Sequence, residues 1–433
     1  MPNCYKNFTN KKSEIIKLSV QNLQTECYYA INLTLPRGYD MSTLKTSVSG
    51  IEFENPFLLA SAPPTASIES IDKAFDMGWG GAVLKTITPD DLEMHDASPR
   101  YATIKSKGKI IGFQNIELLS HKTIQYWCDG IRFLKTKYPN KVIIASIMAP
   151  VECNAWQNLV RTLNSTPIDA YELNFSCPHG MPERNIGMAI GTSVEISILI
   201  TSWVKAVANK PVFVKLTPNV TDITWIAKAV EKAGCDGFAA INTVQGFMGV
   251  NLNTLEPNLC IDGCSTYGGC SGEIVKPIGF KCVAQLRQCS DLPILGMGGI
   301  TNWQDAAQYI TLGADVVQIC TEVMINGYGI IDNLKTGLLN YLEEKGMKDL
   351  KELKNIAIPK ITSHEKLNKE HHLYPNIDNE KCGKCGKCIK ICFESEYHAL
   401  KKKENIIEVD KTACEGCSLC SHVCPQNAIT MVE

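Results

Sequence analysis

The sequence lacks a charge excess, a long hydrophobic run and an apolar leader. Its 433 residues carry 43 Lys and Arg against 45 Asp and Glu, a formal net charge of −2 that gives no indication of a nucleic-acid partner. No apolar run approaches the ~20 residues of a membrane span. The first twenty residues have no continuous apolar stretch and no Arg, which disfavours a secretory signal and a mitochondrial presequence. We therefore expect no nucleic acid and no membrane partner.

The sequence also lacks a G-x-G-x-x-G after any apolar run, which argues against a nicotinamide site on this chain. Cysteine, by contrast, is abundant: there are 20, and eight of them lie between residues 382 and 424. In a small secreted domain they would indicate disulfides. In a long chain without a signal peptide, such clustering indicates metal binding and a reducing compartment, so we expect a cytoplasmic protein.

Eight short apolar runs alternate with longer segments of helical pattern. Fully apolar runs are typical of parallel strands covered on both faces, and the segments between them place apolar residues at i, i+3, i+4 and i+7. The runs span residues 56–62, 81–87, 141–148, 170–176, 211–217, 237–243, 293–300 and 314–320. Eight such units in about 270 residues predict an α/β fold of the (β/α)8 TIM-barrel type. A doubly wound sheet is the alternative, although six strands would be more usual there.

The C-terminal cysteines form two sets with the spacing C-x2-C-x2-C-x3-C. Cys414 lies 32 positions after Cys382, and every other cysteine of the second set follows its counterpart in the first set by the same interval. The segment is therefore an internal duplication. The spacing is that of two-cluster bacterial ferredoxins, in which the fourth cysteine of each set binds the other cluster. We expect one [4Fe–4S] cluster on Cys382, Cys385, Cys388 and Cys424, and another on Cys414, Cys417, Cys420 and Cys392. Zinc sites, the alternative, normally pair C-x2-C with a distant second pair.

These patterns predict four segments: an N-terminal extension of unknown role (1–45), the barrel (46–340), a helix and linker (341–375) and a small α+β two-cluster ferredoxin domain (376–433). One departure in the last segment is Phe393, which stands where a proline is expected after the fourth cysteine. It removes no ligand.

Polar and glycine residues stand at the carboxyl ends of the predicted strands, where barrels of this type hold their active sites. They are Ser61, Lys85, Thr86, Ser146, Asn174, Cys177, Lys215, Asn242, Thr243, Gly298, Gly299, Cys320 and Thr321. One lysine alone would be unremarkable, but two lysines with two asparagines and a cysteine favour a functional site. For Cys177 the alternative is an inert core thiol, because free cysteine is among the most buried residue types.

Two clusters close together form an electron pathway, which requires a cofactor able to exchange two electrons with a substrate and single electrons with iron. A flavin does both. The glycine loops at 266–272 and 296–300 fit a flavin phosphate, because bare backbone N–H groups approach an anion closely. Lys85 and Lys215 would place positive charge against the pyrimidine end of the flavin.

The stretches "ELNFSCPHGMPERNIGMAIG", "KLTPNVTDI", "AAINTV", "YGGCSG" and "GFQNIEL", followed by the cysteine tail, resemble dihydropyrimidine dehydrogenase from about residue 45 to the end. Long forms of that enzyme carry FAD and nicotinamide modules on the same chain. This chain lacks them, so it is similar to the separate catalytic subunit of the NAD-dependent bacterial type. The resemblance implies FMN in the barrel, NAD(H) reached through an FAD- and NAD-binding flavoprotein partner, and a homodimer within a heterotetramer.

The resemblance also implies roles for individual residues. Cys177 resembles the proton donor to C5 of the pyrimidine base, while FMN delivers hydride to C6. The substrate contacts it implies are Asn115, Asn174, Phe175, Ser176, Asn242 and Thr243. The FMN contacts it implies are Ser61, Lys85, Thr86, Lys215, Gly272, Met297, Gly298, Gly299, Cys320 and Thr321. An amide side chain offers both a donor and an acceptor, which suits the alternating C=O and N–H groups of uracil.

We therefore expect reversible reduction of uracil or thymine to the 5,6-dihydro form. A dihydroorotate dehydrogenase-like enzyme is the nearest alternative, because it shares the FMN barrel and a cysteine acid/base. The cysteine tail and "SCPHG" favour the pyrimidine base. A non-catalytic iron–sulfur electron carrier is the third possibility, and it predicts no bound flavin.

Overall fold

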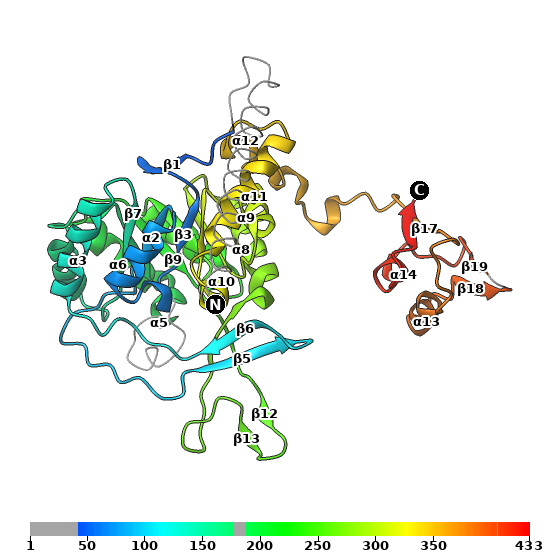
Figure 1. Cartoon of the computed structure of the whole chain (residues 1–433), viewed down its shortest axis with the longest axis horizontal. Coiled ribbons are helices and arrows are strands. Elements are labelled where there is room, and N and C mark those ends of the chain that lie inside the picture. Colours follow the sequence, from blue (N-terminus) through cyan, green and yellow to red (C-terminus); the bar gives the residue numbers. More distant parts are fainter. Residues whose placement is uncertain (1–41, 176–187, 405) are drawn as a thin grey trace, which may run out of the picture. The chain divides into compact units, whose positions relative to one another are not determined.

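The computed structural model describes residues 42–175, 188–404 and 406–433, and divides into two units, residues 1–360 and 361–433 (Figure 1). In the first unit eight parallel strands close into a barrel in the order β10-β15-β16-β3-β4-β7-β8-β9. They are β3 (Phe57–Leu59), β4 (Gly81–Val83), β7 (Val142–Ile147), β8 (Ala170–Asn174), β9 (Val212–Leu216), β10 (Gly237–Ala240), β15 (Ile294–Met297) and β16 (Val316–Ile319). Each lies within one of the eight predicted runs, and the predicted (β/α)8 barrel is confirmed.

Helices follow the strands and cover the barrel. They are α2 (Ile68–Asp76), α3 (Ile124–Lys137), α4 (Cys153–Leu163), α5 (Met188–Gly191), α6 (Val194–Lys205), α7 (Ile223–Lys232), α8 (Lys276–Cys289), α9 (Trp303–Thr311), α10 (Thr321–Asn326), α11 (Ile330–Glu344) and α12 (Leu350–Leu353). Many begin where a side-chain oxygen accepts a hydrogen bond from an early backbone N–H, as Ser67 does for α2, Thr123 for α3 and Asn302 for α9. Such caps satisfy donors that the helix itself leaves without partners. No helix in the described residues is long and apolar enough to cross a membrane.

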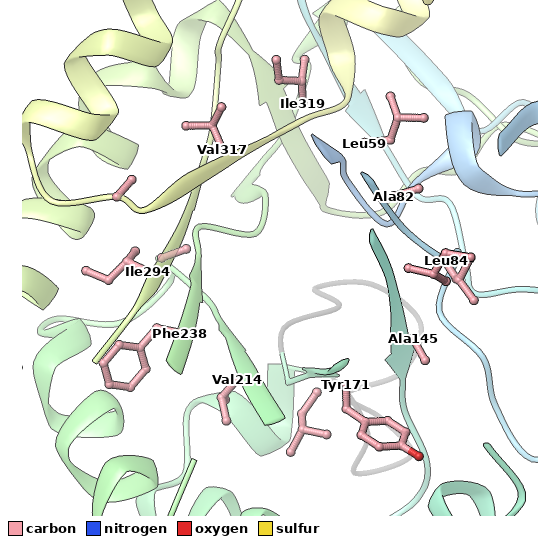
Figure 2. Packing of buried hydrophobic residues seen from close by; sticks show 14 of the residues in the cluster. Leu59, Ala82, Leu84, Ala145, Tyr171, Val214, Phe238, Ile294, Val317 and Ile319 are labelled. Atoms are coloured by element: carbon pink, nitrogen blue, oxygen red, sulfur yellow. The ribbon is translucent and has the colours of Figure 1, made fainter. Parts of the chain in front are cut away.

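The side chains of each strand alternate between two environments. In β8, Tyr171 and Leu173 point outward into the large core shared with the helices, and Figure 2 shows Tyr171, Phe238 and other members of that core around the ring of strands. Ala170 belongs instead to a second cluster inside the barrel, with Phe213 of β9. This alternation follows from the two-residue repeat of a strand. It fixes which residues occupy the barrel interior.

Additional strands stand outside the barrel. The hairpin of β1 (Thr46–Val48) and β2 (Ile51–Phe53) contributes Val48 and Phe53 to the inner cluster. The segments after β4 and β10 form a four-stranded sheet in the order β11-β14-β6-β5. Its strands are β5 (Tyr101–Ser106), β6 (Lys109–Asn115), β11 (Val244–Gly246) and β14 (Gly268–Gly272), and β12 (Val250–Asn251) and β13 (Glu256–Pro257) form a separate pair between the last two.

The "TYGGCSG" segment, interpreted from sequence as a glycine loop, is therefore largely strand β14. Its glycines are needed for close packing rather than for a loop. A Cβ on Gly269 would lie 2.1 Å from Thr243 Oγ1, and one on Gly268 would lie 2.5 Å from the carbonyl oxygen of Asn115. No side chain fits at either position.

The second unit contains β17 (Tyr374–Ile377), α13 (Lys387–Glu394), β18 (Leu400–Lys403), β19 (Ile406–Val409), α14 (Leu419–His422) and β20 (Ile429–Val432). The duplication seen in the sequence recurs in the backbone. Lys384 and Gly416 occupy equivalent positions with φ of 55° and 66°, and Gly386 and Ser418 do so with φ of 72° and 61°. Left-handed residues thus recur at the same places between the cysteines of each half. The predicted α+β dicluster fold is confirmed.

Candidate active site and cluster sites

One cleft opens at the carboxyl ends of the barrel strands and contains about 1290 Å³ of empty space, including its open mouth. Predicted site residues from seven strand ends and from β6 and β14 line it together. They are Ser61, Lys85, Thr86, Asn115, Asn174, Lys215, Asn242, Thr243, Gly272, Met297, Gly298, Gly299, Cys320 and Thr321. The geometry thus gathers into one place residues that are up to 260 positions apart, between Ser61 and Thr321.

Three residues with a predicted catalytic or binding role are not placed in this cleft. Ser176 and Cys177 lie outside the described residues. Phe175 is described, but its side chain is fully buried and its ring packs edge-on against Trp156 at a centroid distance of 6.0 Å. The Phe175 side chain therefore does not reach the cleft, where it was predicted to contact the substrate.

A row of hydrogen bonds links the polar residues across the cleft floor. Asn242 Nδ2 donates to Asn174 Oδ1 at 3.4 Å, and Asn174 Nδ2 donates to Thr86 Oγ1 at 2.9 Å. Thr86 Oγ1 lies 3.0 Å from Ser146 Oγ and 3.2 Å from Ser61 Oγ. The row crosses from the end of β10 to the end of β3, so each amide is held in one orientation by its neighbour. Fixed amides of this kind can hold a planar ring with alternating donors and acceptors.

The two cleft lysines are each paired with a glutamate. Lys85 Nζ lies 3.3 Å from Glu117 Oε1, and Lys215 Nζ lies 3.4 Å from Glu172 Oε1. Both lysines are nearly buried, with 7% and 4% of their surfaces exposed. Buried charges of this kind are stabilised only by close partners, and the pairs leave the cleft floor close to neutral.

Several cleft residues escaped the sequence reasoning. Tyr101 lines the cleft, and burial together with the nearby Glu117 carboxylate raises the pKa of its hydroxyl above its usual range. Glu172 and Gln318 lie inside the barrel, and Gln318 also lines the cleft. Both were visible in the sequence as polar residues within apolar runs, two positions before Asn174 and Cys320.

Cys320 is a second cysteine of the cleft. Burial raises the pKa of its thiol to about 11, although the nearby Lys215 and Lys85 ammonium groups oppose the shift. Its Sγ lies 3.7 Å from Met324 Sδ. The thiol is therefore protonated near neutral pH, and it packs as an apolar group at the end of β16.

The residues present fit a flavin nucleotide. Gly298 and Gly299 have φ of 125° and 75° at the end of β15, and a Cβ on Gly299 would lie only 2.7 Å from the carbonyl oxygen of Gly272. Bare backbone at this strand end is the usual phosphate cradle of such barrels. In addition, the buried Thr243 Oγ1 and Gln318 Oε1 lack hydrogen-bond partners within the described protein, and a polar ligand edge would satisfy both.

The second unit contains two small hollows, each lined by four cysteines. Cys382, Cys385, Cys388 and Cys424 line one of about 310 Å³, and Cys392, Cys414, Cys417 and Cys420 line another of about 340 Å³. These are the two ligand sets that the spacing predicts. Among the described residues no group of three or more His, Cys, Asp or Glu is arranged to hold a single metal ion.

Backbone donors already point at two of these sulfurs. The N–H of Ala399 donates to Cys392 Sγ and that of Ala428 to Cys424 Sγ, both at 3.3 Å. Such hydrogen bonds stabilise ligand thiolates and tune cluster potentials. Phe393, the departure from the expected proline, is 60% exposed and packs its ring against His398, so it is accommodated at the surface.

Comparison with known families agrees with both units. The dihydroorotate dehydrogenase family model matches residues 43–342, and the 4Fe-4S dicluster domain model matches residues 375–431. The chain therefore belongs to the dihydroorotate dehydrogenase family, whose members bind FMN, and carries a dicluster iron–sulfur domain. These family matches confirm the predicted FMN and the two predicted [4Fe–4S] clusters.

Individual relatives place the chain more narrowly. It is 36% identical over 402 residues to the NAD-dependent dihydropyrimidine dehydrogenase subunit PreA of Escherichia coli, covering 90% of this chain and 95% of the relative. It is 37% identical to the chloroplastic dihydropyrimidine dehydrogenase (NADP(+)) of Arabidopsis thaliana, covering 74% and 78%. It is 34% identical to the catalytic subunit of dihydroorotate dehydrogenase B of Pyrococcus abyssi, covering 73% and 99%. The resemblance to dihydropyrimidine dehydrogenase subunits is confirmed, and the chain is an oxidoreductase.

The glycine cradle gives the first testable expectation. Gly299→Ala should lower the FMN content of the purified protein at least tenfold, because its Cβ would meet Gly272 O and Lys276 Cβ within 2.8 Å and crowd the cradle. The measurement is the absorbance of flavin released per protein chain. Gly50→Ala is the matched control, since its φ of 78° imposes the same backbone strain while nothing lies within 4 Å of the added Cβ. Equal flavin loss in both variants would contradict the cradle.

The two cysteine ligand sets lead to a second testable prediction. Cys392→Ser should remove one cluster and leave the other, halving the iron and acid-labile sulfide per chain while the flavin content stays unchanged. Cys282→Ser serves as the control, because Cys282 is a buried thiol on α8 that lines neither hollow. Full iron content in the Cys392 variant would show that this cysteine is not a ligand.

Proposed function

We propose that the protein catalyses the reversible reduction of the 5,6-double bond of uracil or thymine. The observation that carries the proposal is the fixed row of amides at the cleft floor, beside a glycine cradle that fits FMN. Amides from β8, β6 and the end of β10 lie around one cleft, and their donors and acceptors match the edge of a pyrimidine base. The dihydropyrimidine dehydrogenase relatives support the same substrate class.

The charges of the cleft favour an uncharged base over orotate. Its described lining contains Lys85, Lys109 and Lys215, and each lies within 4 Å of a glutamate oxygen. Orotate carries a carboxylate, which is bound most strongly by a cation that is not already neutralised. A neutral uracil ring needs no such cation.

The chemistry requires a hydride at C6 and a proton at C5 of the base. FMN supplies the hydride when it is bound. We assign the proton to Cys177, which follows the cleft residue Asn174 by three positions in the sequence. The asparagines and Thr243 orient the ring so that C5 meets the thiol, and in the reverse direction the thiolate takes the proton back.

Electrons reach the cleft, in this proposal, from NADH through an FAD- and NAD-binding flavoprotein partner and the two clusters. Support comes from the Escherichia coli relative, which is named a subunit of an NAD-dependent enzyme, and from the lack of a dinucleotide fingerprint on this chain. We further propose a homodimer within a heterotetramer. We also propose a cytoplasmic setting, because cysteines clustered as metal ligands indicate a reducing compartment.

The substrate class is tested by anaerobic reoxidation. The purified protein is reduced, uracil, thymine or orotate is added separately, and the flavin absorbance is followed. We expect rapid reoxidation by uracil or thymine and little by orotate. Reoxidation by orotate alone would assign the chain to dihydroorotate chemistry, and the absence of any flavin signal would leave only an electron carrier.

The acid is tested by Cys177→Ala. Turnover should fall by about two to four orders of magnitude, the usual loss for a positioned acid, while FMN and iron contents stay unchanged. Cys289→Ala, at the end of α8 and outside the cleft, should keep normal turnover. Near-normal turnover of the Cys177 variant combined with inactivity of Cys320→Ala would transfer the role to Cys320.

A further inference from the structure

Glu172 is a fully buried carboxylate for which neither the fold nor the proposed reaction supplies a role. It is the third residue of β8, has 0% exposure and points into the barrel, two residues below Asn174. It does not line the cleft itself. A carboxylate inside a protein is costly, and an apolar side chain of similar volume is often as stable or more so. Its presence in the barrel interior therefore calls for a functional explanation.

Its contacts connect it to the cleft from beneath. Lys215 Nζ lies 3.4 Å from Glu172 Oε1, and Gln318 Nε2 donates a hydrogen bond to Glu172 Oε2 at 2.8 Å. Lys215 and Gln318 both line the cleft, and they come from β9 and β16. The carboxylate thus links two cleft residues on separate strands while remaining below the cleft floor.

We propose that Glu172 is a positioning residue that holds the Lys215 ammonium at the cleft floor and sets the positive charge that the flavin experiences. The inference rests on the proposed function, because it requires FMN in this cleft. Reduction of the cofactor adds negative charge to the cleft, and a cation beside it favours the reduced state. A carboxylate 3.4 Å from that cation offsets the effect and keeps the reduction potential of the flavin lower.

The Lys85–Glu117 pair should influence the flavin less than the Lys215–Glu172 pair does. The Glu117 side chain is 18% exposed, against 0% for Glu172, and it is shared with Arg100 Nε at 3.4 Å. Solvent screens charges at partly exposed positions, whereas a fully buried charge acts through a low dielectric. The potential of the flavin should therefore depend more strongly on Glu172.

The test is the two-electron reduction potential of the bound flavin in Glu172→Gln. The substitution keeps the shape and the capacity to hydrogen-bond Gln318 but removes the negative charge. We expect the equilibrium to shift towards reduced flavin at least tenfold, about 30 mV for a two-electron couple, with FMN still bound. Glu172→Asp, which retains a carboxylate but withdraws it from Lys215, should shift the potential in the same direction by a smaller amount.

Asp315→Asn is the matched control. Asp315 precedes β16, at the end of the barrel opposite the cleft, and its carboxylate lies 3.4 Å from Arg287 Nη2. Removing this charge should leave the potential unchanged. An equal shift in the control, or flavin potentials at the wild-type value in Glu172→Gln and Glu172→Asp, would overturn the inference. Should Glu172→Gln not fold, the Glu172→Asp result decides alone.

The outcomes also separate the inference from the function on which it rests. Wild-type protein that binds no flavin would overturn both. Wild-type protein that binds flavin and is reoxidised by uracil or thymine, with unchanged potentials in both Glu172 variants, would overturn only the role of Glu172.

Discussion

Closure of eight parallel strands into a ring is the constraint on which the rest of the structure depends. Once the ring is closed, every second side chain of each strand must fill a narrow interior. Near the start of the strands the interior is apolar, with Phe213 and Ala170 packed against residues of the β1–β2 hairpin. Two residues further along, the same alternation brings Glu172, Lys215 and Gln318 inside. The polar layer beneath the cleft is therefore a direct product of strand register.

That polar layer shapes the chemistry above it. Charged groups in the interior have few water molecules to solvate them, so each one must be satisfied by another side chain. The Lys215–Glu172 pair and the row from Asn242 to Ser61 meet this requirement. Rigid, preorganised dipoles of this kind cost little reorganisation when charge changes in the cleft. Fixed partners for these side chains thus serve both the stability of the barrel and the chemistry of the cleft.

Much of this architecture was predictable from the sequence because its signals are local. The eight apolar runs fix the barrel, and the cysteine spacing fixes the two sets around the hollows. Strand-end position also indicated residues that lie together in one cleft, since parallel strands bring their carboxyl ends to one edge.

What the sequence could not reveal depends on distant partners. The β11-β14-β6-β5 sheet joins two insertions, so its strands carry weak local patterns and "TYGGCSG" was interpreted as a loop. The family resemblance implied a substrate contact for Phe175, but strand alternation directs its ring towards Trp156 instead. The sequence did not single out Glu172 because its partners, Lys215 and Gln318, stand on other strands.

The sheet over the cleft has a consequence for the order of folding. Its central pairing joins β6 to β14, with Asn115 opposite Gly269, and β7 to β10 lie between them along the chain. The entropic cost of closing a loop rises with its length, so such distant pairings form after local ones. Asn115 and Gly272 line the cleft from these two paired strands, so the lining is complete only when this distant pairing has formed.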